Sequence, residues 1–204
     1  MNMRQGLLVG LLAALCYARS ARAGGSAEVM VGDESAVVDI KASGDLGHRA
    51  GIFARNRTRI DYHNQVSPFT LVDLTYSLGE GFDAVGEAQM APGMGIMPRV
   101  GVQYFHSFGD GSVYAFASGS HQDPNLELLA TVRYTPTITG DVRGFAQLEA
   151  LTDFGRDGHE FSTQRARLGI EIDGYRIGAA ADLTEVGHDM TPSYNLGGFV
   201  AKNF

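Results

Sequence analysis

Hydrophobic and polar residues alternate along most of the chain with a period of two, which is the period of a β-strand. In residues 163–174 the even-numbered positions are mainly apolar, whereas the odd-numbered positions include Arg165 and Arg167. Residues 175–185 repeat the pattern, and the Asp-Gly pair between the two segments predicts a tight hairpin turn. Each of these strands therefore has one apolar face and one charged face.

The same alternation recurs in segments spaced along the whole chain. Most of them reach the roughly 9 to 11 residues that a strand needs to cross a membrane. The predicted strands are residues 27–32, 36–44, 49–62, 69–78, 81–91, 97–108, 111–120, 126–134, 142–150, 163–174, 175–185 and 192–204.

The connections between these strands carry their own pattern. The chain has 27 glycines, about twice the usual share, and they mark turns between the segments. Alternate connections are short, such as residues 109–111, whereas others, such as residues 154–159 and 185–193, are longer. Tight turns at one end and longer loops at the other are typical of outer-membrane barrels. A soluble β-sandwich, with its apolar faces inward, gives no reason for that difference.

The last predicted strand runs through Tyr194 and ends on an aromatic residue, Phe204. With this ending and the alternation before it, residues 24–204 resemble the porin-like class of bacterial outer-membrane β-barrels. The resemblance implies an all-β fold, an antiparallel up-and-down transmembrane β-barrel, with Phe204 as the C-terminal insertion signal. Because single-chain bacterial barrels have an even number of strands, we expect about twelve, with ten as the fallback. The alternative fold is a secreted soluble β-sandwich that acts as a binding module.

Residues 1–23 predict a cleavable signal peptide, with a basic start, an apolar stretch and a small-x-small site before Gly24. Residues 24–204 then form a single β-barrel domain. Removal of the signal leaves 13 basic and 23 acidic residues, so the formal charge falls from −7 to −10. An acidic exported chain argues against a nucleic-acid partner. We expect a location in the bacterial outer membrane, with outer-membrane lipid and, through the C-terminal strand, the barrel-insertion machinery as partners.

If the barrel closes, the charged faces of the strands line its interior. The residues predicted to line the lumen are Arg55, Arg57, Arg59, Asp73, Glu87, Glu127, Arg133, Arg143, Glu149, Arg165, Arg167, Glu171, Arg176 and Asp182. A ring of arginines with opposed carboxylates can form a constriction that orients small polar or anionic solutes. The same residues can instead pair across neighbouring strands and fill a narrow barrel.

These features predict a narrow passive pore for small polar solutes or ions. The alternative is a non-conducting structural or surface-binding envelope barrel. We do not expect catalysis, because His106 and Ser107 are adjacent and so point to opposite faces of a strand. Four histidines fall on predicted outer loops: His63, His121, His159 and His188. We interpret them as solvated side chains, so neither a metal site nor a cofactor is predicted.

Overall fold

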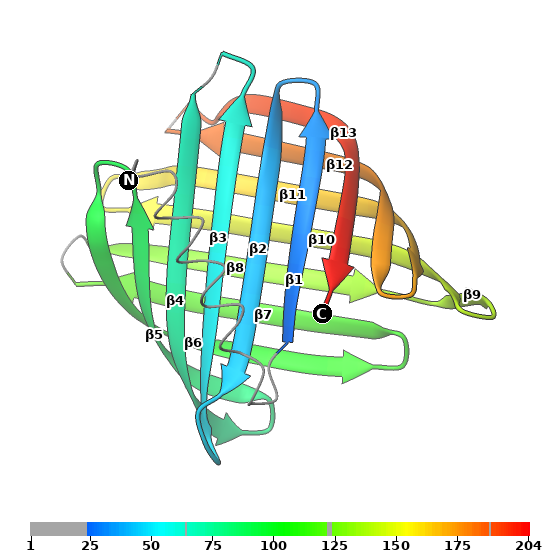
Figure 1. The fold of residues 1–204 in the computed structure, drawn as a ribbon. Helices are drawn as coiled ribbons and strands as arrows, with labels where there is room; N and C mark the ends of the chain where they lie inside the picture. Colours follow the sequence, from blue (N-terminus) through cyan, green and yellow to red (C-terminus); the bar gives the residue numbers. More distant parts are fainter. Residues whose placement is uncertain (1–23, 64, 122–123, 188) are drawn as a thin grey trace, which may run out of the picture.

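The computed structural model describes residues 24–204 apart from residues 64, 122, 123 and 188, so the predicted signal peptide lies outside the described residues. The described chain forms thirteen β-strands joined by short turns (Figure 1). They are β1 (Gly24–Gly32), β2 (Ser35–Asp45), β3 (Ala50–Asp61), β4 (Val66–Gly79), β5 (Phe82–Ala91), β6 (Gly95–Phe108), β7 (Gly111–Ser120), β8 (Asn125–Tyr134), β9 (Thr137–Thr139), β10 (Val142–Gly155), β11 (Gly158–Ile172), β12 (Tyr175–Val186) and β13 (Thr191–Asn203). This part of the chain contains no helix long and apolar enough to span a membrane.

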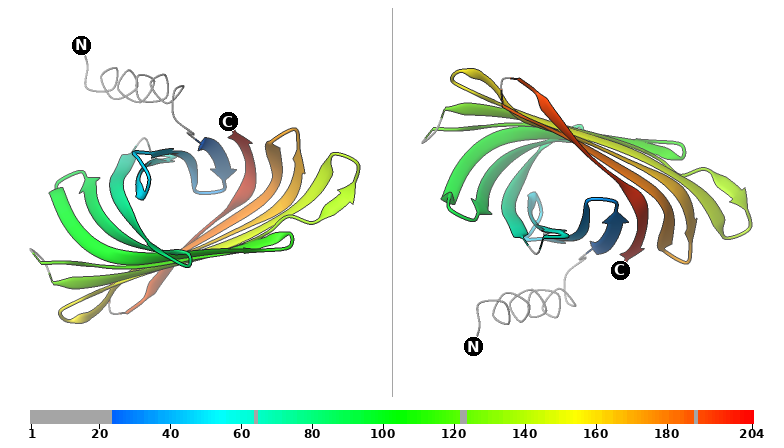
Figure 2. Two further views of the ribbon diagram at one scale, coloured as in Figure 1. Left: turned by 90° about the horizontal axis from the view of Figure 1, so that it is seen from below. Right: turned by 90° about the horizontal axis from the view of Figure 1, so that it is seen from above.

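Twelve of these strands form a closed antiparallel ring. Each pairs with the next strand along the chain, except that β8 pairs with β10, and β1 closes the ring by pairing with β13. Figure 2 shows this closure from both ends of the barrel, with β1 beside β13. Strand β9 lies outside the ring and pairs with β10. The prediction of an antiparallel β-barrel of twelve strands is confirmed.

The hairpin between β11 and β12 shows how local sequence sets strand register. Asp173 and Gly174 have φ values of 51° and 72°, as a two-residue turn of type I′ requires at both central positions. Glycine has no Cβ to oppose this conformation, and aspartate is among the other residues that adopt it. The turn places Ile172 opposite Tyr175, which brings the apolar faces of the two strands to the same side of the sheet. This predicted turn is confirmed.

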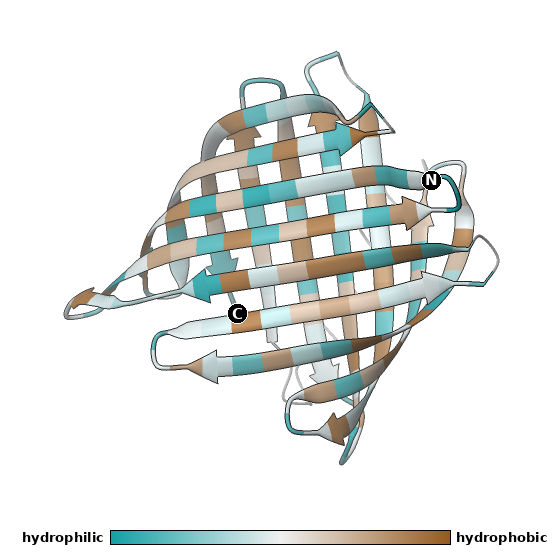
Figure 3. Ribbon diagram, turned by 180° about the vertical axis from the view of Figure 1, so that it is seen from behind, coloured by the Kyte–Doolittle hydropathy of each residue, from teal (hydrophilic) through white to brown (hydrophobic). Residues whose placement is uncertain are grey.

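The side chains on the outer face of the ring are apolar and exposed. Val100, Leu168 and Leu74 keep 73%, 67% and 57% of their surface exposed. Figure 3 shows hydrophobic and hydrophilic positions alternating along the strands. One end of the barrel is where β1 begins and β13 ends, and we call it the end with the termini of the described chain. Near this end Phe82 packs on Tyr104 with ring centroids 4.7 Å apart. An apolar outer band with aromatic residues at its edge is typical of barrels that face lipid.

The connections differ in length from the prediction. At the end of the barrel opposite the termini, where longer loops are predicted, they are residues 33–34, 62–65, 92–94, 121–124, 156–157 and 187–190. At the end with the termini they are residues 46–49, 80–81, 109–110, 135–141 and 173–174. The predicted difference is therefore wrong. Its physical reason is that ladder pairing continues through polar segments, as where His159 lies opposite Phe154 and Gly158 opposite Gly155. Backbone hydrogen bonding does not require apolar side chains at the rim.

Candidate functional site inside the barrel

Alternation turns every second side chain of a strand into the barrel, and charged residues gather there. Of the fourteen residues predicted to line the lumen, seven are buried: Asp73, Glu87, Glu127, Glu149, Arg167, Arg176 and Asp182. The other seven are half-buried: Arg55, Arg57, Arg59, Arg133, Arg143, Arg165 and Glu171. Their neighbours along the strands, such as Leu74 and Leu148, are exposed on the outer face. The structure thus places the fourteen side chains on the inner side of the wall.

Four acids and four arginines on one side of the interior form linked ion pairs, and we call these eight residues the paired wall. Its members lie on β1, β2, β3, β10, β11 and β12: Glu28, Asp39, Arg55, Arg57, Glu149, Arg165, Arg167 and Asp182. Strand register places opposite charges side by side, since Glu149 lies opposite Arg165 and Asp39 lies opposite Arg57. Cross-strand pairs of opposite charge stabilise a sheet. With four carboxylates and four guanidinium groups, the paired wall is formally neutral.

The ion pairs of the paired wall are close and shielded from solvent. Arg167 lies 2.7 Å from Asp182 and 2.9 Å from Glu28. Arg57 lies 2.7 Å from the same Asp182. The side chains of Arg167 and Asp182 are only 3% and 8% exposed, and ion pairs at such positions are screened by salt much less than surface pairs. Because one carboxylate serves two arginines, its loss would leave both without their shared partner.

A chain of ion pairs crosses the interior from one side to the other. Arg55 Nε donates to Asp39 Oδ1 at 2.9 Å, and Arg55 Nη2 lies 3.3 Å from Glu149 Oε1. Glu149 also accepts a hydrogen bond from Arg165. Strands β3 and β10 lie halfway round the ring from each other. The Arg55–Glu149 pair therefore connects opposite sides of the barrel and divides its cross-section at this level.

An apolar cluster fills the interior beside the paired wall. Its members are Met30, Val37, Phe145, Ala180, Phe199 and Ala201. The rings of Phe145 and Phe199 lie 5.9 Å apart, and Arg176 lies over Phe145 with its Cζ atom 4.9 Å from the ring centroid. Arg176 also lies 3.5 Å from Glu171. Aromatic and cation–π contacts of this kind stabilise the packing beyond the area that they bury. They explain why Phe145 occupies an inward position on an otherwise charged face.

Three further predicted arginines have other partners, although Arg133 Cζ also lies 6.0 Å from the centroid of the Phe145 ring. Arg59 lies 3.8 Å from Glu34 at the end opposite the termini, and Arg143 lies 3.7 Å from Asp110 at the end with the termini. The side chains of both arginines are 40% exposed, and ion pairs at such exposure contribute little. Arg133 donates to a glutamine of the neighbouring strand at 3.1 Å. These arginines do not join the chain of pairs that crosses the barrel.

The other side of the interior carries an excess of carboxylates, and we call it the acidic wall. Its members lie on β4, β5, β6, β8 and β10: Asp73, Glu87, Arg99, Glu127 and Asp153. Four acids and one arginine give it a formal charge of −3. Three of the acids belong to the predicted lumen residues, whereas Arg99 and Asp153 do not.

The sequence interpretation also missed inward residues on both sides of the barrel. They include Glu28, Asp39, Lys41, Gln89, Arg99 and Asp153. A signal for Asp39 was available, because it alternates with the apolar Val38 and Ile40 and shares its face with Lys41. Arg99 follows a proline in a segment rich in methionine and glycine, where the alternation is weak.

The prediction that His159 lies on an outer loop is wrong. It lies in β11, where Nδ1 is 3.0 Å from the carbonyl oxygen of Gly187 and Nε2 is 2.7 Å from Ser162 Oγ. The ladder register shifts by one residue between Asp153 and Phe154, which brings His159 and Ser162 to the same face. Ser162 Oγ in turn donates to a threonine hydroxyl at 3.1 Å. The absence of catalysis stays a prediction.

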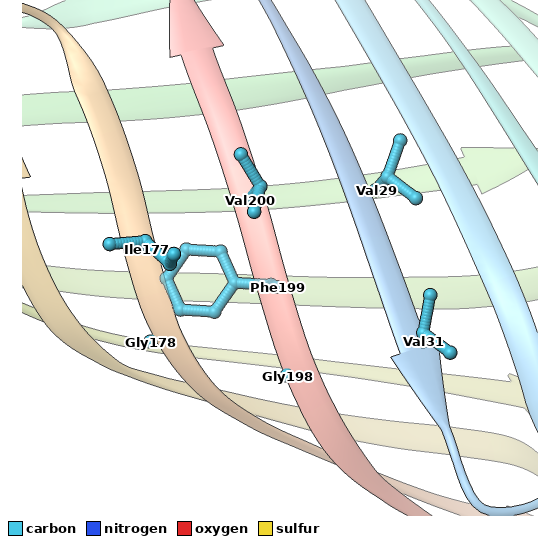
Figure 4. A pocket seen from close by; sticks show the side chains of 7 residues that line it. All are labelled: Val29, Val31, Ile177, Gly178, Gly198, Phe199 and Val200. Carbon is cyan, nitrogen blue, oxygen red and sulfur yellow. The ribbon is translucent and has the colours of Figure 1, made fainter.

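A recess on the outside of the barrel lies where β1, β12 and β13 meet (Figure 4). It is lined by Val29, Val31, Ile177, Gly178, Gly198, Phe199 and Val200. Gly198 has no side chain to fill the space between the exposed valines and Ile177, which leaves a recess in the outer surface. All of the lining residues are apolar, and the recess offers no group for polar recognition.

Among known proteins, solved structures match this chain, and they match it by fold. No protein-family model matches the chain, and no curated protein matches it. The solved structure of the KdgM porin is 14% identical, with a TM-score of 0.53 over 89% of this chain and 99% of that chain. The chain shares the β-barrel fold of that structure. A second structure, the KdgM porin in complex with disordered oligogalacturonate, has 11% identity and a TM-score of 0.54 over the same shares of both chains.

A looser likeness extends to OpdK from Pseudomonas aeruginosa. It has 11% identity and a TM-score of 0.40, over 84% of this chain and 67% of that chain. That score is too low to support an argument. The likeness to the KdgM porin, at its low identity, concerns the barrel architecture alone.

Proposed function

We propose that this protein is an outer-membrane barrel that acts as a narrow, porin-like passive channel for small polar solutes or ions. The observation that carries the proposal is the reversed polarity of the closed ring. Val100 and Leu168 are 73% and 67% exposed outside, whereas Arg167 and Glu149 are each 4% exposed inside. Charged groups inside a barrel require water or opposite charges as partners. An apolar band around the outside of a closed barrel suits contact with lipid.

The same reversal supports the proposed membrane location, and the closing strand supports the proposed partners. The apolar outer face and the aromatic residues at its edge suit the hydrocarbon and interface of a bilayer. Strand β13 closes the ring on β1, and Phe204 exchanges backbone hydrogen bonds with Gly25 at 2.9 and 3.0 Å. A C-terminal strand that completes the ring is a suitable contact for insertion machinery. Outer-membrane lipid and that machinery remain the proposed partners, and no cofactor is part of the proposal.

A second candidate is a barrel that stays closed. The Arg55–Glu149 pair across the interior and the packed Phe145–Phe199 contact favour it, because both occupy space that a solute would need. Barrels of about 8 strands are filled by their own side chains, whereas barrels of 16 to 18 strands leave an aqueous channel. A twelve-strand ring lies between these classes, so conduction has to be measured.

The test is single-channel recording of refolded residues 24–204 in a planar bilayer. Heat-dependent gel mobility first shows that the barrel is folded. Steady openings of small conductance support the channel. Silence from folded, inserted protein contradicts the channel and supports the closed barrel. An Arg55→Gln variant sharpens the result. If the unmodified barrel is silent and the variant conducts, the Arg55–Glu149 pair closes the barrel.

A further inference from the structure

The acidic wall contains like charges in direct opposition. Asp73 lies opposite Glu87 on the neighbouring strand, and Glu127 lies opposite Asp153. Like charges directly opposite each other destabilise a sheet. The paired wall shows the reverse arrangement for its carboxylates, since Glu149 lies opposite Arg165. On its other side Glu87 lies opposite Arg99, so the strands of the acidic wall compensate one of its four carboxylates and leave a formal charge of −3.

The one arginine of the acidic wall does not neutralise it. Arg99 Nε lies 3.5 Å from Glu87 Oε1, but the closer contacts of the guanidinium go to neutral groups. Nε donates to Ser118 Oγ at 2.9 Å, Nη1 donates to Asn125 Oδ1 at 2.9 Å, and Nη2 donates to the Ser118 carbonyl oxygen at 3.2 Å. Arg99 thus shares its charge with one of the four carboxylates.

The amide of Gln89 is a further donor to these acids. Its Nε2 donates to Glu87 Oε1 at 2.9 Å and to Glu127 Oε2 at 3.1 Å, which draws carboxylates of β5 and β8 together. Asp73 receives no such support. It is 6% exposed, and within the described chain its Oδ1 has no hydrogen-bond partner. A buried carboxylate oxygen without a donor calls for an explanation, and a water molecule or a cation beside it would supply one.

We propose that the channel selects cations, and that small monovalent cations pass along the acidic wall, where their charge compensates Asp73, Glu87, Glu127 and Asp153. The inference rests on the proposed channel function and adds the class of solute. Carboxylate-lined passages favour cations by charge. In the part of the chain that the structure describes, no group of three or more His, Cys, Asp or Glu side chains is arranged to hold a metal ion. We therefore propose that the carboxylates attract a cation along the passage without chelating it at one site.

The position of the paired wall supports the same route. The Arg55–Glu149 pair divides the cross-section, and the apolar cluster occupies the side of β1, β2, β10, β12 and β13. The arginines on that side already have carboxylate partners, so they offer little net attraction to an anion. The uncompensated charge lies on β4, β5, β8 and β10.

The experiment measures the reversal potential of single channels under a potassium chloride gradient. The unmodified barrel should prefer potassium several-fold over chloride. An Asp73→Asn, Glu87→Gln, Glu127→Gln variant should lose most of that preference. The matched control, Glu80→Gln, Asp157→Asn, Asp189→Asn, removes the same number of charges from exposed turns and should keep it.

Each outcome decides between the proposals. Openings that prefer chloride, or a preference for potassium that survives in the lumen variant, overturn the cation route while the channel stands. Complete silence from folded protein overturns the channel and with it this inference. If the triple variant does not show the heat-dependent mobility of a folded barrel, Asp73→Asn alone provides the test, because it leaves the Glu87–Arg99 contact in place. An unchanged reversal potential in that variant counts against the proposal.

Discussion

The paired wall and the acidic wall are built from the same strand pattern, yet their charges behave differently. In both, an inward charged residue alternates with an outward apolar one. In the paired wall the register places Arg165 beside both Glu149 and Asp182. In the acidic wall it places Asp73 beside Glu87. The two walls therefore differ in composition, with four arginines in one and one in the other, and in register, which places opposite charges side by side in the paired wall and like charges side by side in the acidic wall.

The contrast has one internal exception. Lys41 lies opposite Arg55 in the ladder, so the half of the interior with the paired wall also contains like charges in opposition. Asp39 lies near both of them, 3.9 Å from Lys41 Nζ and 2.9 Å from Arg55 Nε. A shared carboxylate relieves that repulsion. In the Asp73–Glu87 pair, Arg99 lies near Glu87, but no ion pair among the described residues includes Asp73.

The largest change in stability should come from removing the shared carboxylate of the paired wall. Glu149→Gln leaves Arg55 and Arg165 without their common partner, and breaking a buried ion pair costs about 3–5 kcal/mol. We expect the urea midpoint of unfolding, followed by loss of the fast-migrating folded band, to fall sharply. An unchanged midpoint would show that these arginines are solvated by water in the lumen and do not depend on Glu149.

The next largest effect should come from the apolar cluster beside the paired wall. Phe199→Ala removes a ring that is 2% exposed and packs on Phe145. Loss of such a buried ring lowers the free energy of unfolding by about 3 kcal/mol. The same urea titration measures it. Val200→Ala, on the outer face of the same strand, is the matched control and should change the midpoint much less.

A smaller effect of opposite sign should come from the acidic wall. Asp73→Asn removes one member of an opposed like-charged pair and supplies an amide donor toward Glu87. We expect the free energy of unfolding to rise by up to about 1 kcal/mol. Glu149→Gln and Asp73→Asn each neutralise one inward carboxylate, so opposite shifts of the urea midpoint would show that the two walls differ. A fall in both would remove the distinction.

The smallest effect should come from the exposed pair at the end with the termini. Asp110→Asn removes the partner of Arg143, and both side chains are 40% exposed or more. Such surface pairs contribute about 0.3 kcal/mol. The urea midpoint should stay within experimental error of the unmodified barrel. A shift as large as that of Glu149→Gln would mean that charge removal destabilises this barrel wherever it occurs.

Much of the fold could be predicted from the sequence because the determining signal is local. Alternation with a period of two marks each strand, and the Asp-Gly pair at Asp173 sets a hairpin through backbone conformations that both residues tolerate. The inward direction of Arg165 and Glu171 follows from the same alternation. The lengths of the connections could not be predicted, because pairing at the rim depends on the partner strand and not on the polarity of the segment.

The pairing of charges could not be predicted for a different reason. The ladder between β4 and β5 shifts register between Ser77 and Gly79, beside a turn in which Glu80 has a φ of 55°. This irregularity places Asp73 opposite Glu87, and a one-residue difference would turn one of the two outward. The Arg55–Glu149 contact joins residues 94 positions apart. Neither arrangement leaves a trace in the local pattern.

The pair between Arg55 and Glu149 also has a mechanical meaning. A hollow tube in a bilayer is compressed from the side, and an empty one resists flattening only through the stiffness of its wall. A contact that joins opposite sides acts as a strut and fixes the width of the tube at that level. Because both side chains are at most 10% exposed, dissolved salt weakens the strut less than it weakens pairs at the rim. The shape of the barrel should accordingly persist in salt that abolishes its surface electrostatics.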